Sequence, residues 1–310
     1  MPDSTPVNGS SPTTAPSGPR PSLATWVAGA RPRTLPAAVV PVALGAVVGM
    51  GEHGARWWTV PFALFVSLAL QVGVNYANDY SDGVRGTDEV RVGPIRLVAS
   101  GAATPGAVKR AAFAAFGAAA LAGAVLAATT SWWLIAVGAA SVLAGWFYTG
   151  GSHPYGYLGL GEVFVFVFFG LVATVGTTFV VLERLPSLAW VLGCVAGCLS
   201  CALLVVNNLR DIPTDRDVGK RTLAVRLGDR HTRWFYVSLL ATAFVLVAVA
   251  AVIGPIGALA GLVAVAATVS PVRTVLGGAV GRGLIPVLGA TGRVQLLVGL
   301  LVTLGVALTA

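Results

Sequence analysis

The stretch NYANDYSDGVRGTD, residues 75–88, places acids and amides directly after a long apolar segment. The run near 57–77 is long and apolar enough to cross a lipid bilayer. Charged side chains at such a boundary are costly to hold in lipid, and they usually mark a functional site. The sequence therefore predicts a polar site at the mouth of a membrane-spanning helix.

The composition is that of an integral membrane protein. Of 310 residues, 56% are hydrophobic and only 10% are charged, and the mean hydropathy is +0.82. A soluble domain usually carries about 25% charged residues. Residues 1–22 are rich in Pro, Ser, Thr and Gly, which predicts a disordered cytoplasmic tail. Residues 23–310 are then the transmembrane domain.

Nine apolar runs are long enough to span the membrane. They lie near 34–50, 57–77, 111–129, 132–149, 162–182, 187–208, 233–253, 255–271 and 292–309. An Asn-rich helix end that leads into acids occurs twice, after the second and the sixth run. We therefore predict an all-α membrane protein of nine transmembrane helices, arranged as two related halves plus one helix.

The basic residues predict the orientation. When the N-terminal tail and the loops after even-numbered spans are placed on one side, that side holds eighteen of the 20 Lys and Arg residues, and the other side holds Arg56 and Arg184. The positive-inside rule then predicts a cytoplasmic N-terminus and an external C-terminus in the cell membrane. Because this asymmetry explains much of the net charge of +8, we expect membrane lipid rather than nucleic acid as a partner. The preference for Arg over Lys, with much Ala, Gly and Val, indicates a bacterial source.

The two acid clusters have the same helical spacing. If the second helix continues through its polar end, one face carries four polar side chains at i, i+3, i+4 and i+7, namely Asn75, Asn78, Asp79 and Asp82. Glycines then place Asp88 in a loop. The second cluster, NNLRDIPTD, repeats the pattern with an Asn at 207 or 208, Asp211 and Asp215.

Two facing acidic walls predict a site for a hard divalent cation. Mg²⁺ prefers oxygen ligands, and substrate phosphates commonly complete its coordination. Basic side chains that could hold phosphate oxygens lie close by in the sequence, namely Arg91, Arg96, Arg210, Lys220 and Arg221. The pattern favours a diphosphate ester with an apolar remainder. Solvated loop acids are the simpler alternative, but helical spacing in both clusters argues against it.

A cation-coupled transporter is an alternative from a different class, since paired carboxylates within a membrane also mark ion sites. Transporter sites lie near the bilayer midplane, however, whereas these acids lie at helix ends beside Arg and Lys. The end position favours an enzyme that acts on a phosphorylated lipid.

The motif NDYSDGVRGTD (78–88), with RVGPIRLVASG (91–101) and NNLRDIPTDRDVGKRTLAVRLG (207–228), resembles the UbiA-type superfamily of intramembrane prenyltransferases. Within that superfamily, ARPRTLPAAVVPVALG (30–45) and the 148–170 region are similar to the 1,4-dihydroxy-2-naphthoate polyprenyltransferase branch of menaquinone biosynthesis. The resemblance covers nearly everything after residue 24. The pair Glu89-Val90 departs from the expected more polar pair, but it touches no proposed ligand.

The resemblance implies nine helices around a central cavity and a transferase that uses Mg²⁺. The reaction would move a polyprenyl chain from polyprenyl diphosphate to 1,4-dihydroxy-2-naphthoate, with loss of CO₂ and diphosphate, to give demethylmenaquinol. Another acceptor, such as 4-hydroxybenzoate or a porphyrin, stays open at this point.

The resemblance also implies roles for single residues. The metal ligands would be Asn78, Asp82, Asp211 and Asp215, and Asp79 and Asp88 are further catalytic motif positions. Arg96 and Lys220 would contact the prenyl diphosphate, and Asn75, Arg91 and Arg210 are further candidate substrate-binding residues.

For the acceptor, Arg31 and Arg33 are candidates to bind the carboxylate, with simple topological anchoring as the alternative. Tyr148 and Glu162 would orient or deprotonate the hydroxyls. Alternatively, Tyr148 is an interfacial aromatic residue and Glu162 a partner of a helix N-terminus.

Overall fold

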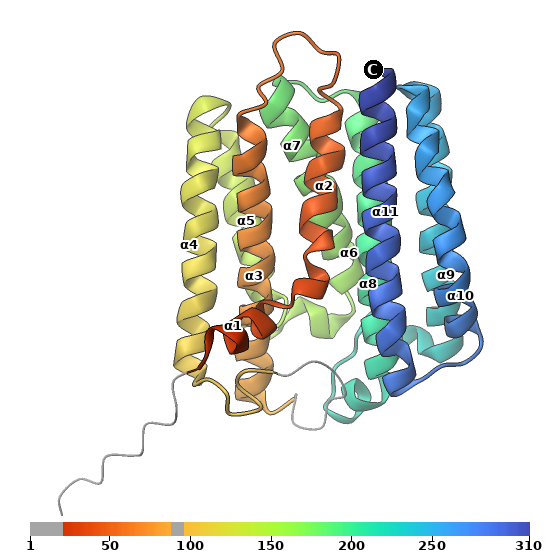
Figure 1. The fold of residues 1–310 in the computed structure, drawn as a ribbon. Helices are drawn as coiled ribbons and strands as arrows, with labels where there is room; N and C mark the ends of the chain where they lie inside the picture. The colour runs from red at the N-terminus through yellow and green to blue at the C-terminus, as the bar shows by residue number, and fades with distance from the viewer. Residues whose placement is uncertain (1–20, 88–95) are drawn as a thin grey trace, which may run out of the picture.

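The computed structural model describes residues 21–87 and 96–310, and in this part of the chain all regular structure is helical. The long helices stand side by side with similar axis directions (Figure 1). The helices of the first half are α1 Leu23–Ala30, η1 Pro32–Thr34, α2 Pro36–Val47, α3 Thr59–Arg85, α4 Pro105–Thr129, α5 Trp133–Phe147 and η2 Tyr155–Leu158. The remainder are α6 Gly161–Val165, η3 Phe166–Val172, α7 Ala173–Leu182, α8 Ser187–Asp217, α9 Leu223–Ile253, η4 Ile256–Thr268, α10 Val269–Leu276, η5 Gly281–Leu284 and α11 Ile285–Thr309.

The chain is a multi-pass membrane protein. Among the described residues, seven helical segments are long and apolar enough to cross a membrane, and α2 and α5 are shorter apolar helices. The seven long segments and the two shorter helices coincide with the nine apolar runs of the sequence. The all-helical class is confirmed, whereas the count of nine spans and the two related halves stay predictions.

The two motif-bearing helices are longer than the apolar runs from which they were predicted. α3 continues eight residues beyond 77 to Arg85, where Gly86 ends it in the left-handed conformation with φ +71°. α8 continues from 208 to Asp217, with Pro213 inside its last turns. Both acid clusters therefore lie on helices, as their spacing predicts.

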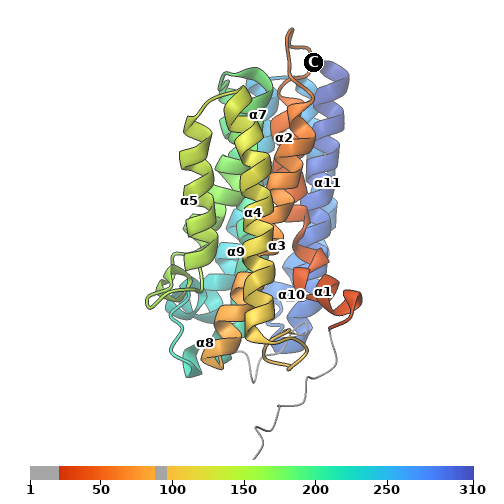
Figure 2. The same ribbon diagram turned by 90° about the vertical axis from the view of Figure 1, so that its left-hand side faces the viewer.

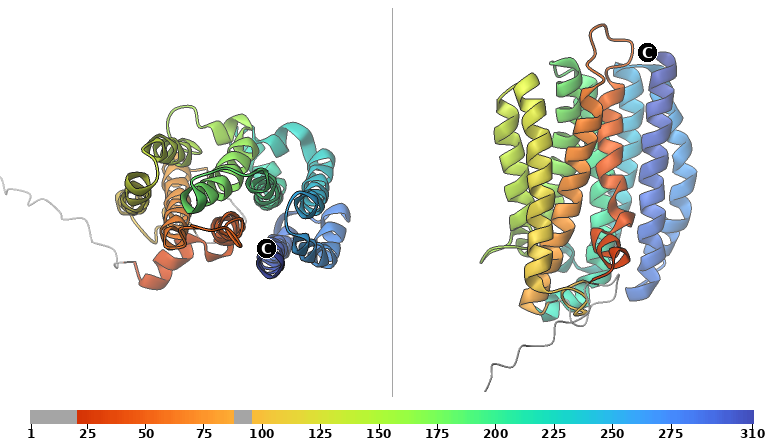
Figure 3. Two further views of the ribbon diagram at one scale, coloured as in Figure 1. Left: turned by 90° about the horizontal axis from the view of Figure 1, so that it is seen from above. Right: turned by 60° about the vertical axis from the view of Figure 1, so that its left-hand side comes forward.

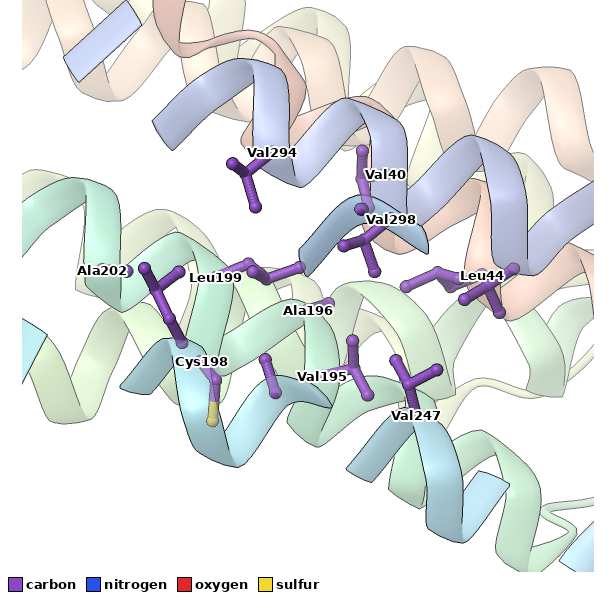
Figure 4. Close-up of a cluster of buried hydrophobic side chains, with 14 of the residues drawn as sticks. Val40, Leu44, Val195, Ala196, Cys198, Leu199, Ala202, Val247, Val294 and Val298 are labelled. Atoms are coloured by element: carbon purple, nitrogen blue, oxygen red, sulfur yellow. The ribbon is translucent and has the colours of Figure 1, made fainter. Parts of the chain in front are cut away.

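The packed core surrounds α8. Its side chains contact α2, α9 and α11 in a cluster that includes Val195, Leu199, Val298, Val247 and Leu44 (Figure 4). In lipid, helices associate through close packing of small residues rather than through exclusion of water. Such a contact joins the segment α6–η3–α7 to α8.

Gly170 and Gly197 form this contact. A Cβ added to Gly170 would lie 2.5 Å from the Cα of Gly197. Gly170 belongs to η3, a π-helical segment between α6 and α7. A π-helical segment inside an α-helix is frequent at functional sites, because it changes which side chains face a neighbouring element.

The two ends of the bundle differ. α1 and the ends of α3 and α8 lie at the end opposite the C-terminus (Figures 1 and 2). Seen from above, α9, α10 and α11 occupy one side of the molecule and α4 and α5 the opposite side (Figure 3). The acid clusters of α3 and α8 are thus brought to one end.

Candidate active site

A cavity of about 330 Å³ lies among α2, α3, α4, α5, α8 and the segment α6–η3–α7. On α3 its lining runs from Ala63 to Asp82, which corresponds to about 28 Å of helix at about 1.5 Å per residue. Apolar side chains such as Val42 and Leu126 line the part near Ala63, and acids, amides and bases line the part near Asp82. The cavity therefore suits a long apolar molecule with one charged end.

The first polar wall is the end of α3. Asn75, Asn78 and Asp82 are buried and line the cavity. The hydroxyl of Thr149, which follows α5, donates to Asn78 Oδ1 over 2.9 Å. The helix thus presents amide and carboxylate oxygens on one face, as the spacing predicts.

Asp82 is surrounded by donors from three separate segments. Tyr157 donates its hydroxyl to Asp82 Oδ1 over 2.7 Å, and Lys220 Nζ donates to the same oxygen over 3.2 Å. Arg96 Nη2 lies 3.9 Å from Asp82 Oδ2. Lys220, Arg96 and Asp82 all line the cavity. Positive charge is therefore concentrated beside this carboxylate, where an anionic group could bind.

Asp79 lies apart from the cavity lining and anchors a loop. Its two carboxylate oxygens accept hydrogen bonds from the backbone N–H groups of Leu97 and Val98 over 2.9 and 3.0 Å. Gly83, one turn later, gives Val98 room, because a Cβ there would lie 2.5 Å from the Val98 side chain. The catalytic role that the sequence predicts for Asp79 is untested, and the geometry favours positioning of the loop that carries Arg96.

The second polar wall is the end of α8. Asn207, Asn208, Asp211 and Asp215 all line the cavity, opposite the residues of α3. Pro213 has no backbone N–H to donate to the carbonyl of Leu209, so the last turns of α8 are weakened where the acids lie. The two clusters face the same cavity, as the sequence predicts.

The position of Arg210 does not match its predicted role in substrate binding. It does not line this cavity, and its guanidinium forms a two-fold ion pair with the neighbouring Asp211, with Nε and Nη2 each 2.7 Å from a carboxylate oxygen. Both side chains are buried. Arg210 thus fixes the Asp211 carboxylate from behind, so the geometry favours positioning over contact with substrate.

Tyr157 is a site residue that the sequence reasoning missed. It belongs to η2, in the glycine-rich segment between α5 and α6. The Lys220 ammonium lies 4.7 Å from its ring centroid and the Arg85 guanidinium 5.4 Å. Burial raises the pKa of Tyr157, the Asp82 charge raises it further, and Lys220 lowers it. The available signal was the presence of three tyrosines within 148–157 beside conformationally free glycines.

The four residues predicted for an aromatic acceptor fall into two groups. Arg31 and Tyr148 line the cavity, whereas Arg33 is exposed and Glu162 lies behind the lining. Glu162 Oε1 accepts a hydrogen bond from Asn208 over 2.9 Å, and its other oxygen is buried without a hydrogen-bond partner among the described residues. Arg31 is therefore the better placed of the two arginines, and Glu162 acts on the site through Asn208.

Two further predicted residues, Asp88 and Arg91, lie outside the described residues. Within the described ranges, no three Asp, Glu, His or Cys side chains form a group that could hold a metal ion. Instead, single carboxylates from opposite walls face one cavity beside bases. This donor set fits Mg²⁺, which usually takes one or two protein carboxylates and completes its coordination with phosphate oxygens and water.

Residues 38–276 match the UbiA prenyltransferase family. A 1,4-dihydroxy-2-naphthoate octaprenyltransferase from Mycobacterium tuberculosis is 51% identical over 275 residues, which cover 89% of this chain and 94% of the relative. An Escherichia coli protein of the same name is 35% identical and covers 72% of this chain and 75% of its own length.

Solved structures share the fold. A UbiA homologue from Archaeoglobus fulgidus bound to GPP and Mg²⁺ has a TM-score of 0.65 at 14% identity, with coverage of 92% of this chain and 99% of the homologue. The apo structure of a UbiA homologue from Aeropyrum pernix K1 has a TM-score of 0.64 at 15% identity, with coverage of 87% and 97%. At these identities the likeness shows the common helical architecture.

Proposed function

This chain belongs to the UbiA prenyltransferase family, and we propose that it transfers a polyprenyl chain from polyprenyl diphosphate to 1,4-dihydroxy-2-naphthoate. CO₂ and diphosphate leave, and the product is demethylmenaquinol. One observation carries the proposal: Asp82 of α3 and Asp211 and Asp215 of α8 line the same end of a long apolar cavity, beside Arg96 and Lys220. The names of relatives at 35–51% identity support the choice of acceptor.

The charged end of the cavity suits the leaving diphosphate. Lys220 and Arg96 neutralise charge that develops on the leaving oxygen, which is electrostatic stabilisation of the transition state. Asn78, Asp82, Asp211 and Asp215 would hold Mg²⁺, which when bound supplies additional positive charge to the diphosphate. Asp79 and Arg210 act indirectly, because they fix the loop of Arg96 and the carboxylate of Asp211.

The apolar length of the cavity suits the prenyl chain. As the allylic C–O bond breaks, its electron pair leaves with the diphosphate. The walls formed by residues such as Val42 and Leu126 exclude water from the allylic cation. The ring carbon that bears the carboxylate supplies the electron pair of the new C–C bond. The pair of the broken carboxylate bond returns to the ring as CO₂ leaves.

The acceptor carboxylate would be held by Arg31, which lines the cavity at the turn between α1 and α2. Arg31 has φ +53°, a conformation that non-glycine residues adopt at a cost of about 1–3 kcal/mol and that is common at functional sites. Tyr148 and Asn208, with Glu162 behind it, would contact a ring hydroxyl from the opposite wall.

The test is an acceptor screen with the purified protein. We expect farnesyl or geranylgeranyl diphosphate, Mg²⁺ and 1,4-dihydroxy-2-naphthoate to give prenylated product with release of CO₂, and chelation by EDTA to stop it. Product formed only with 4-hydroxybenzoate would remove the naphthoate assignment. Absence of diphosphate release with every acceptor would favour a transporter.

We further propose nine membrane spans in the plasma membrane of a bacterium, with the N-terminus in the cytoplasm and the C-terminus outside. The distribution of Lys and Arg supports this orientation. The active-site end would then face the cytoplasm, where soluble diphosphate can leave.

A further inference from the structure

Gln71 is a buried polar residue in the cavity wall to which the mechanism above gives no role. It lies on α3 four residues before Asn75, and both side chains line the cavity. Residues at i and i+4 lie on the same helix face, with about 5–6 Å between their Cβ atoms. The two carboxamides therefore lie one above the other on the wall that faces the cavity.

Both carboxamide nitrogens donate to the same hydroxyl. Gln71 Nε2 and Asn75 Nδ2 each lie 3.1 Å from Thr34 Oγ1, and Asn75 Nδ2 also donates to the carbonyl of Ala30 over 2.9 Å. The Thr34 hydroxyl donates its single hydrogen to the carbonyl of Arg31 over 2.9 Å. Its oxygen can therefore only accept from the amides, and this fixes which way both carboxamides face.

This fixed orientation leaves two acceptors for a ligand. The nitrogens point at the segment 30–34, so the Gln71 and Asn75 carbonyl oxygens are on the opposite side of each amide. In the described part of the chain, neither oxygen accepts a hydrogen bond. Neither oxygen is among the fully buried polar atoms that lack a partner, so both keep some exposure. The wall thus offers two acceptors from these amides, while both N–H groups of Asn75 and one of the two N–H groups of Gln71 are used within the protein.

We propose that Gln71 and Asn75 recognise the hydroxyl groups of the aromatic acceptor, which makes Gln71 a specificity-determining residue. The inference rests on the proposed function and extends it to substrate selection. Arg31 holds the carboxylate, and Asn75, which contacts the residue before Arg31, accepts from the hydroxyl nearest to it. Gln71 lies one turn deeper and accepts from the hydroxyl para to that one.

The chemistry of the pair selects a reduced dihydroxy ring. A quinone has only acceptors at these positions, so its carbonyl oxygen beside Asn75 would face the amide oxygen without a hydrogen between them, because both Asn75 N–H groups are already used. A ring that lacks the second hydroxyl would leave the Gln71 oxygen without a partner, and a site built to bind a hydroxyl rejects the analogue that lacks it.

Equilibrium binding of two naphthoates tests this selection. The ligands are 1,4-dihydroxy-2-naphthoate and 1-hydroxy-2-naphthoate, and their intrinsic fluorescence reports Kd for the full-length protein. We expect the wild type to bind the dihydroxy compound about tenfold or more tightly than the monohydroxy compound. In Gln71→Leu this preference should fall to about one, with Kd for the monohydroxy compound nearly unchanged.

The same substitution at Gln295→Leu is the matched control, because Gln295 is buried between α8 and α11 and does not line the cavity. It should keep the wild-type preference. Equal weakening of both ligands by Gln71→Leu would mean that Gln71 only supports Arg31, and an unchanged preference would mean that it has no role; either result overturns the inference. A wild type that binds neither naphthoate would instead contradict the proposed function.

Discussion

At the scale of single residues, Asp82 connects three segments of the site to α3. It joins α3 to η2 through Tyr157, to the α8–α9 loop through Lys220 and to the loop after α3 through Arg96. Each of these partners is a hydrogen-bond donor, and two carry positive charge. The carboxylate therefore organises the cations that a diphosphate needs, besides offering oxygens to a metal.

Removal of a motif carboxylate should stop catalysis but leave the fold in place. We expect Asp82→Asn and Asp211→Asn to lower kcat by at least about 10³-fold, because each loses a charge aimed at the reacting end. Asp217→Asn is the matched control, since Asp217 is an exposed residue at the end of α8. The measurement is turnover per protein in the membrane fraction, and near-wild-type turnover in both variants would contradict the assignment.

The Tyr157 hydroxyl should act through Asp82, to which it donates. Tyr157→Phe removes a hydrogen bond to a charged group, which contributes about 1.5–3 kcal/mol. We expect kcat/KM for prenyl diphosphate to fall about tenfold or more, with KM for the acceptor unchanged. Steady-state kinetics with each substrate varied in turn checks this, and an equal change in both KM values would indicate a general distortion.

The effect of Tyr157→Phe should be independent of pH across the working range. An ordinary tyrosine titrates near about pH 10, and burial with the nearby Asp82 raises the pKa of Tyr157. The phenol thus stays protonated and keeps donating to Asp82 throughout. The ratio of wild-type to variant kcat/KM should be flat between about pH 7 and pH 9, and a ratio that falls toward one with rising pH would show that the phenol ionises in this range.

Asp79 tests the distinction between a catalytic and a positioning carboxylate. Asp79→Ala leaves the buried N–H of Leu97 and the partly buried N–H of Val98 without their acceptor. A buried N–H without an acceptor costs about 1–3 kcal/mol, so we expect a lower Tm together with lower activity. Asp79→Asn keeps one acceptor oxygen and should fall between wild type and Asp79→Ala in both measurements. Loss of activity at an unchanged Tm would restore the catalytic role that the sequence predicts.

At the scale of elements, the sequence predicted the helical positions well because the hydrophobic runs have the length of a bilayer. It also predicted that both acid clusters share a cavity, since the i, i+3, i+4, i+7 spacing persists through α3 and α8. It did not predict the partners of those acids. Thr149 and the Leu97 and Val98 amides reach α3 from loops, and Tyr157 reaches it from the four-residue helix η2. Such short connecting segments have no periodic sequence signal.

The same limit explains the roles of Arg210 and Gln71. The position of Arg210 beside the second acid cluster makes it a candidate to bind phosphate in the sequence. Only the direction of its side chain in the structure shows that it pairs with Asp211. Gln71 lies within an apolar run and has no motif around it. Its hydrogen bond to Thr34 links residues 37 positions apart in the sequence. That contact depends on how the turn before α2 folds back onto α3.

The contact between η3 and α8 should be intolerant of any side chain. A Cβ on Gly170 would meet the backbone of Gly197 at 2.5 Å and the Gly193 carbonyl oxygen at 2.8 Å, and backbone atoms cannot move aside alone. We expect Gly170→Val to cost at least about 1–3 kcal/mol of stability through overpacking.

Thermal unfolding in detergent measures this cost. Gly289→Ala is the control, because a Cβ at this α11 position meets nothing within 4 Å and replaces a flexible residue in a helix, which stabilises by about 0.5–1 kcal/mol. A Tm for Gly170→Val equal to that of wild type would show that the two helices separate more easily than their packing indicates.

At the scale of the whole molecule, the two ends are chemically distinct. The end near the C-terminus carries few charges, and Arg56 there pairs with Glu183 while its guanidinium also bonds the carbonyls of Thr129 and Val180. Four tryptophans at this end are exposed, namely Trp57, Trp58 and Trp132 in loops and Trp133 at the start of α5. Exposed tryptophan is typical of a membrane–water interface. The opposite end holds the acid clusters and most bases.

This asymmetry predicts which end faces the cytoplasm, and cysteine labelling can measure it on the full-length chain. The natural cysteines Cys198 and Cys201 are buried, and Cys194 is partly buried in α8. Ala310→Cys should react with a membrane-impermeant maleimide in intact cells, whereas Arg230→Cys, at an exposed position near the start of α9, should react only after lysis. The physical reason is that the predicted topology places eighteen of 20 basic residues on the inner side, where positive charge retains the loops. Labelling of both positions from the same side would require an even number of spans between them and would contradict the odd number of crossings that α9, the segment η4–α10 and α11 supply.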